Sequence, residues 1–185
     1  MALIAVICLI SSATSCTTIV RSGKLRPEYV GVDPRVQSLV DEYKWISAQN
    51  HIEFTKNVTI GLKKINSDLT IGLCNYGGYF REIDLDIDFW NNAGPMQRLA
   101  LTFHELTHCY CNRGHDYGMD QVYPENIAER IKEALEWRKD GGIRPGHWDD
   151  GCPTSLMYPV VVDTDCMKTH YSEYIKEMLN RCEPW

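Results

Sequence analysis

The sequence predicts a single-domain α+β fold. Its 185 residues suit one domain with a full hydrophobic core. Hydrophobic residues make up 44% of the chain and charged residues 24%. These fractions are close to the average of soluble globular proteins, which argues against disorder and coiled coils. The predicted elements follow the order helix, strands, helix, helix, loop, helix, without the alternating strand–helix units of a parallel α/β sheet.

The first residues of the chain indicate export. Residues 1–15 carry no charge, and their apolar run over 2–10 is too short to span a bilayer but fits a signal peptide. Small residues precede Cys16, as in a bacterial lipobox, although Ala13 stands where a larger aliphatic residue is usual and no basic residue begins the chain. We expect a signal peptide over 1–15 and a tether over 16–33. The protein is then either anchored at the cell envelope by a lipid on Cys16 or secreted.

The cysteine content agrees with an oxidising compartment. Apart from Cys8 and Cys16, the chain has an even set of cysteines, which is consistent with up to three disulfides. The spacing does not select a pairing. The alternative of a zinc site at Cys109 and Cys111 is disfavoured, because only one residue separates them and no second such pair exists. The six cysteines are Cys74, Cys109, Cys111, Cys152, Cys166 and Cys182.

The domain over 34–185 begins with a predicted helix and three β-rich runs. Asp33 as N-cap and Pro34 in the first turn predict a helix to about Gln49. The β-rich runs cover 58–65, 69–73 and 79–89. In the third run, apolar residues alternate with acidic ones, which predicts an edge or antiparallel strand with a solvated acidic face and no calcium site. We expect an extended peptide to bind along this edge.

Three further helices are predicted. The stretch over 91–95 ends the third β run, and the next helix begins at Pro95 and carries apolar residues on its inner face. Another helix covers 124–138, and a last one covers 169–181. Between them, the Gly-, Pro- and Asp-rich stretch over 141–151 predicts an irregular loop.

The strongest chemical signal is the motif His104-Glu105-Leu106-Thr107-His108 on the helix that begins at Pro95. Residues four apart on a helix share a face, so both imidazoles can bind one ion. Neutral imidazole nitrogen suits zinc, and the glutamate after the first histidine can reach a metal-bound water. The motif therefore predicts a zinc site with Glu105 as general base.

A catalytic zinc needs a third protein ligand, and His115 is the nearest candidate. In a continuous helix, its seven-residue separation from His108 would place it about 10 Å further along the axis. The helix must therefore end between them. Asn112 and Gly114 tolerate the left-handed conformation that ends helices, so we expect a turn that brings His115 back to the metal.

These residues resemble metzincin peptidases, which combine His-Glu-x-x-His with a third histidine and a distant Met-turn. Residues 155–159, Ser-Leu-Met-Tyr-Pro, look like the Met-turn of matrixins. The third histidine lies one residue further on than in the family, and Cys111 stands where the family has glycine. The same longer spacing and a lipobox cysteine are similar to a group of bacterial lipoprotein metallopeptidases. The resemblance covers roughly residues 58–159.

The resemblance implies a small twisted mixed sheet with an active-site helix, a Met-turn and a C-terminal helix. It further implies one catalytic Zn²⁺, held by His104, His108 and His115, and an endopeptidase acting on proteins or peptides. Met157 would lie beneath the metal, and Pro159 with Val160 and Val161 would form a wall of the substrate pocket. Tyr158 is assigned no role.

Several alternatives stay open. Glu125 or Glu129 would supply the third ligand in a gluzincin, and His147 is a further candidate from the loop. A zinc-containing surface lipoprotein without activity is the alternative from another class. A net charge of −6 without a basic cluster argues against a nucleic-acid partner, and we expect a monomer. His51 and His170 have no neighbouring partners in the sequence and are predicted to lie at the surface.

Overall fold

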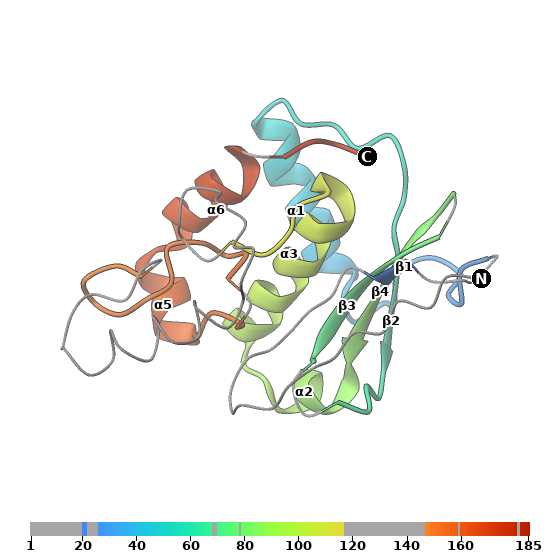
Figure 1. Cartoon of the computed structure of the whole chain (residues 1–185), viewed down its shortest axis with the longest axis horizontal. Coiled ribbons are helices and arrows are strands. Elements are labelled where there is room, and N and C mark those ends of the chain that lie inside the picture. The colour runs from blue at the N-terminus through green and yellow to red at the C-terminus, as the bar shows by residue number, and fades with distance from the viewer. Residues whose placement is uncertain are drawn as a thin grey trace, which may run out of the picture.

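Figure 1 shows the computed structural model, which describes residues 20–21, 26–67, 70–77, 79–116, 147–158, 160–180 and 182–185. The expected signal peptide, Cys16, Pro159 and the helix predicted over 124–138, with Glu125 and Glu129, lie outside the described residues. The described elements confirm an α+β fold with a small mixed sheet. They are β1 (Val20–Arg21), α1 (Gln37–Gln49), β2 (Thr59–Lys63), β3 (Gly72–Tyr76), β4 (Arg81–Asp86), α2 (Ile87–Asn92), α3 (Pro95–Cys111), α5 (Thr164–Thr169) and α6 (Tyr171–Asn180).

The sheet has the strand order β1-β3-β4-β2. The pair β3–β4 is antiparallel, whereas β1–β3 and β2–β4 are parallel. Of the two alternatives predicted for the strand over 79–89, antiparallel pairing is confirmed by β3, whereas the edge position is wrong, because β4 has a partner on each side. The strand also ends earlier than predicted, since the Asp86 carboxylate accepts a hydrogen bond from the backbone N–H of Phe89 and caps α2.

The acidic face of β4 is buried, contrary to the prediction of a solvated face. Glu82, Asp84 and Asp86 are only 0%, 3% and 7% exposed. The segment before α1 covers the first two: the backbone N–H groups of Glu28 and Tyr29 donate to Glu82, and the Tyr29 hydroxyl donates to Asp84 at 2.8 Å. Asp86 accepts from the backbone N–H groups of Ile65 and Phe89. Buried carboxylates are tolerated where hydrogen-bond donors surround them, and the alternation of residue types alone does not reveal these donors.

Helix α3 lies at the centre of the fold, with the sheet on one side and α5 and α6 on the other (Figure 1). It packs on the face of the sheet opposite to the acidic side chains, where Cys74 of β3 forms a disulfide with Cys109. Helix α1 also packs on α3 through Tyr43, whose ring meets that of Phe103 edge to face at 5.3 Å. Thirteen residues of α3, Leu99 to Cys111, are buried, so the part of the helix that carries the metal motif is enclosed by the rest of the fold.

Three disulfides join the six cysteines of the predicted set, and their pairing could not be predicted from the sequence. The pairs are Cys74–Cys109, Cys111–Cys182 and Cys152–Cys166. Three disulfides are typical of proteins that fold in an oxidising environment.

Among the described helices, none combines the length and the apolarity that crossing a membrane requires.

The last predicted helix, over 169–181, is confirmed as α6, and a short helix that was not predicted, α5, precedes it. The Asp163 side chain caps α5 by accepting from the backbone N–H groups of Asp165 and Cys166. His170 separates α5 from α6 and leaves the helical conformation. This break turns α6 so that its buried residues, Tyr174, Met178 and Leu179, join the core.

Candidate metal centre

The predicted end of the motif-bearing helix is confirmed: α3 stops at Cys111, and Asn112 adopts the left-handed conformation with φ 54°. A helix end leaves four carbonyl groups without an intrahelical partner. In α3, donors from distant segments satisfy all four. The carbonyl of His108 accepts from the Tyr76 hydroxyl, that of Cys109 from the Arg81 guanidinium, and those of Tyr110 and Cys111 from the backbone N–H groups of Trp185 and Glu183. Contacts with segments outside the helix therefore determine where α3 ends.

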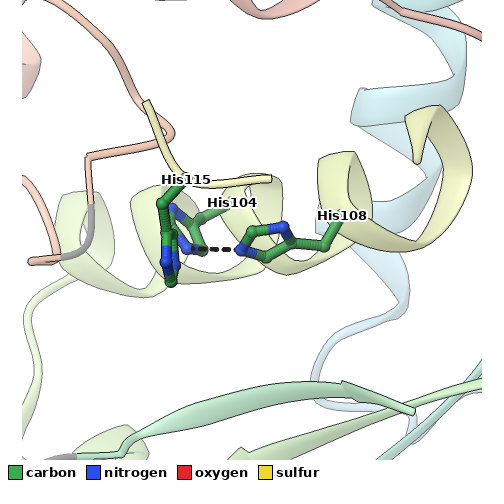
Figure 2. Close-up of side chains that lie close together, drawn as sticks. All are labelled: His104, His108 and His115. Carbon is green, nitrogen blue, oxygen red and sulfur yellow. Dashed lines mark hydrogen bonds between the residues drawn. The ribbon is translucent and has the colours of Figure 1, made fainter. Parts of the chain in front are cut away.

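The structure brings His104, His108 and His115 together (Figure 2). His104 and His108 share one face of α3, and the turn after Asn112 returns His115 to them. The ring centroids lie 4.6 Å apart for His104–His108, 4.9 Å for His108–His115 and 5.3 Å for His104–His115. One nitrogen of each ring lies within 4.8 Å of the others, so the three side chains form a group that can hold a metal ion.

Backbone carbonyls orient two of the three rings. The Nδ1–H of His104 donates to the carbonyl of Leu156 at 2.8 Å, and that of His108 donates to the carbonyl of Arg113 at 2.5 Å. Since a carbonyl only accepts, each neutral ring must carry its hydrogen on Nδ1 and present a lone pair at Nε2. These two Nε2 atoms face each other at 3.0 Å (dashed line in Figure 2). Opposed lone pairs at this distance suit a cation between them.

Burial keeps the imidazoles in the form that binds metal. It lowers the pKa of His104 to about 4 and that of His115 to about 3. The pKa of His108 also falls well below its ordinary value, because the ring is buried and lies beside His104 and His115. The three rings are therefore neutral at pH 7, as metal ligation requires. Nε2 of His115 is buried and has no hydrogen-bond partner within the ranges that the structure describes, which leaves a nitrogen available to an ion.

Glu105 is fully buried beside this group, and neither of its carboxylate oxygens has a hydrogen-bond partner among the described residues. Burial raises the pKa of this carboxyl well above its ordinary value, and the charge of Asp84 raises it further. The side chain lies against Gly72 of β3, where a Cβ atom would come within 2.4 Å of Glu105 Oε1. A buried carboxylate without partners destabilises a fold, so this arrangement marks a candidate catalytic group.

The turn that contains Met157 lies next to the histidine group. Met157 is fully buried, and its carbonyl accepts from the backbone N–H of Asp116 at 2.9 Å. The carbonyl of Leu156 orients His104, as described above. The turn over 155–158 is thus tied both to the residue after His115 and to the first histidine of α3.

The remaining predicted site residues have varied outcomes. Val160 is 42% exposed and Val161 is half-buried; since Pro159 is not described, the pocket wall stays a prediction. His147 is not part of the histidine group, and its ring lies 4.9 Å from that of Tyr158. His51 is exposed, as predicted.

The prediction that His170 has no partner is wrong. Its Nε2 lies 2.6 Å from Asp150 Oδ2, and its ring stacks on Trp148 at 3.7 Å. Cys152 is close to this pair, but its sulfur belongs to a disulfide. It therefore cannot act as a thiolate ligand, and we do not regard this cluster as a metal site.

Sequence reasoning missed the groups that orient the metal candidates, namely the carbonyls of Arg113 and Leu156. Every residue has a carbonyl, so no residue type signals this role.

The chain matches no protein-family model, and neither a curated protein nor a solved structure is detectably similar to it.

Proposed function

We propose that this chain is a zinc-dependent endopeptidase with a metzincin-like architecture. His104, His108 and His115 would hold one ion, and Glu105 would be the general base. The observation that supports this most is the convergence of three neutral imidazoles beside a buried carboxylate for which the described residues supply no hydrogen-bond partner. Either feature alone is compatible with a structural role, but together they match the needs of metal-assisted hydrolysis.

The donor set favours zinc over harder cations. Three neutral imidazole nitrogens suit zinc, whereas calcium and magnesium take oxygen ligands. Three protein ligands also leave a coordination position for water or substrate, as in catalytic zinc sites. A bound zinc ion would polarise the scissile carbonyl and lower the pKa of water.

Glu105 supplies the proton transfer. Its carboxylate accepts a proton from the attacking water as the carbon–oxygen bond forms, and then delivers it to the amine as the carbon–nitrogen bond breaks. By the same resemblance, Met157 forms the apolar floor of the site.

The sheet offers an edge for an extended peptide close to Glu105. Among the described residues, β1 pairs with Asn75 and Tyr76 of β3, and the Gly72 end of β3 has no further strand on that side. A peptide added there would place its backbone beside the Glu105 carboxylate. This edge replaces β4 as the proposed strand against which the substrate binds.

The three disulfides support the further proposal of an exported protein, with lipid attachment at Cys16.

Metal analysis and a cleavage assay test the proposal. We expect one zinc ion per chain, and cleavage of an unstructured protein that a chelator abolishes and added zinc restores. His115→Ala should lose both metal and activity, whereas His51→Ala, a change of an exposed histidine outside the group, should keep both. Zinc without cleavage would identify a non-catalytic metal protein. Metal retained by His115→Ala would point to a downstream carboxylate, and a metal-free wild type would refute the proposal.

Gly72→Ala should lower kcat/KM about tenfold or more, because the added methyl group must displace the Glu105 carboxylate. Metal content should stay unchanged, since Glu105 is not part of the histidine group. The matched control is Gly94→Ala at the start of α3, because a Cβ atom there meets only Gln97 Oε1 among the described residues, at an ordinary contact distance of 3.8 Å. Equal activity of the two variants would show that the position of Glu105 beside Gly72 is not needed for cleavage.

A further inference from the structure

Two irregular segments hold the candidate ligands in place. The segment over 112–116 supplies His115 and the carbonyl that orients His108. The turn over 155–158 supplies the carbonyl that orients His104. Neither segment belongs to a helix or a strand, and the backbone hydrogen bond from Asp116 N–H to the carbonyl of Met157 at 2.9 Å links them directly.

One carboxylate of α6 joins the two segments. Oε1 of Glu177 accepts a hydrogen bond from Arg113 Nη2 at 2.6 Å, and Oε2 accepts from the Ser155 hydroxyl at 2.9 Å. Arg113 and Ser155 are 42 residues apart in the sequence (155 − 113). The two oxygens of a single side chain therefore provide a second link between the segments, in addition to the backbone hydrogen bond from Asp116 to Met157.

Each of the two residues that Glu177 contacts is connected in turn to a candidate ligand. On one side, the carbonyl of Arg113 accepts from His108 Nδ1–H. On the other side, the Ser155 oxygen accepts from the backbone N–H of Met157 at 3.0 Å, which fixes the turn whose Leu156 carbonyl accepts from His104. Glu177 is thus connected to both histidines of α3 through one or two residues, without contacting either ring.

The Arg113 contact is strong and enclosed. The Arg113 side chain is only 8% exposed, and its guanidinium also donates to the carbonyls of Glu177 and Met178 at 3.2 Å and lies 3.5 Å from Asp116. Charge-assisted hydrogen bonds of this kind are about twice as strong as neutral ones. Without the Glu177 carboxylate, the buried guanidinium would lose its closest acceptor, and only the two longer contacts to the carbonyls of Glu177 and Met178 would still join the segment that carries His115 to α6.

We infer that Glu177 is a positioning residue for the metal centre, which sets the placement of the histidines through Arg113 and Ser155. This inference rests on the proposed metal site. Groups that orient metal ligands typically change metal affinity by about 10- to 100-fold when they are removed. Glu177 acts one step further out, so the expected change lies at about the lower limit of this range.

Titration of the metal-free protein with Co²⁺, followed by visible absorption, tests the role without using activity. Glu177→Ala should bind Co²⁺ about tenfold more weakly and give an altered absorption band, while far-UV circular dichroism shows an unchanged fold. Glu177→Gln keeps an acceptor for Arg113 and offers an amide N–H to the Ser155 oxygen, so it should restore most of the affinity and the wild-type band. Ser155→Ala breaks only one of the two contacts and should give an intermediate loss. It also serves as the test variant if Glu177→Ala does not fold.

The matched control is Glu173→Ala, the same change one turn earlier on α6, at an exposed side chain. It should bind Co²⁺ as the wild type does. The positioning role would be overturned if folded Glu177→Ala showed the affinity and the spectrum of the wild type. The same result in Ser155→Ala would overturn it if Glu177→Ala does not fold. Either result would leave the proposed function intact. A weakened Glu177→Gln with no recovery relative to Glu177→Ala would overturn the role of these hydrogen bonds. A wild type that binds no Co²⁺ or zinc would refute the proposed function itself, and this inference with it.

Discussion

Glu105→Gln is expected to lower kcat/KM for peptide cleavage by about 10²- to 10⁴-fold, which is the usual contribution of a general acid–base group. Glutamine has nearly the same volume and fills the same space against Gly72, but it cannot accept the proton from water. Zinc content should stay at the wild-type level, because the three histidines remain unchanged. Steady-state kinetics together with metal analysis of the same preparation measure both effects.

The same variant should not lose stability. In the metal-free protein, both oxygens of Glu105 are buried and accept no hydrogen bond from the described part of the chain, so the fold gains nothing from the carboxyl group that the substitution removes. Urea unfolding in the presence of a chelator should therefore give a free energy of unfolding equal to or above that of the wild type. A residue with a structural role would show the opposite result.

Glu82→Gln is the matched control, since Glu82 is an equally buried glutamate of the same domain. Its carboxylate accepts hydrogen bonds from the backbone N–H groups of Glu28 and Tyr29, on the face of the sheet away from α3. This variant should lose stability and keep kcat/KM. Undiminished cleavage by Glu105→Gln would remove Glu105 from the mechanism.

The features that the sequence predicts best are those that depend on local geometry. The spacing of His104 and His108 defines one helical face, and α3 presents both there. The conformational freedom of Asn112 predicts the end of the helix, and its φ of 54° agrees. The position of His115 near the other two histidines follows from the helical spacing and the helix end, because a short turn after a fixed helix end can place a side chain only close to that end.

The features that the sequence does not reveal depend on contacts between distant segments. The acidic residues of β4 alternate as on a solvated strand, yet residues 28 and 29 cover two of them, and no local pattern encodes this contact. The central position of β4 in the sheet is likewise not visible in the local sequence. It depends on β2, which is distant in the sequence and pairs with β4. Arg113 and Glu177, which are 64 residues apart, look like ordinary surface charges until α6 is placed against the metal candidates.

Loss of the disulfide Cys111–Cys182 should have the largest effect on stability. Its sequence separation is 71 residues, for which the chain-entropy account gives about 4 kcal/mol. The bond also joins the last residue of α3 to the segment whose Glu183 and Trp185 donate to the end of that helix. Removing it releases these donors together with the link. The double variant Cys111→Ala/Cys182→Ala should therefore unfold at a much lower urea concentration than the wild type.

Cys152→Ala/Cys166→Ala is the comparison, because its separation of only 14 residues corresponds to about 3 kcal/mol in the same account. An equal or larger loss in this variant would show that neither loop length nor the donors to α3 decide the stability of the domain. Zinc links this result to the metal centre, since a ligand that binds only the folded state stabilises it by about 4 kcal/mol at a thousand times its Kd. Saturating zinc should thus offset most of the loss in Cys111→Ala/Cys182→Ala, provided that the end of α3 still brings His115 to the other two imidazoles.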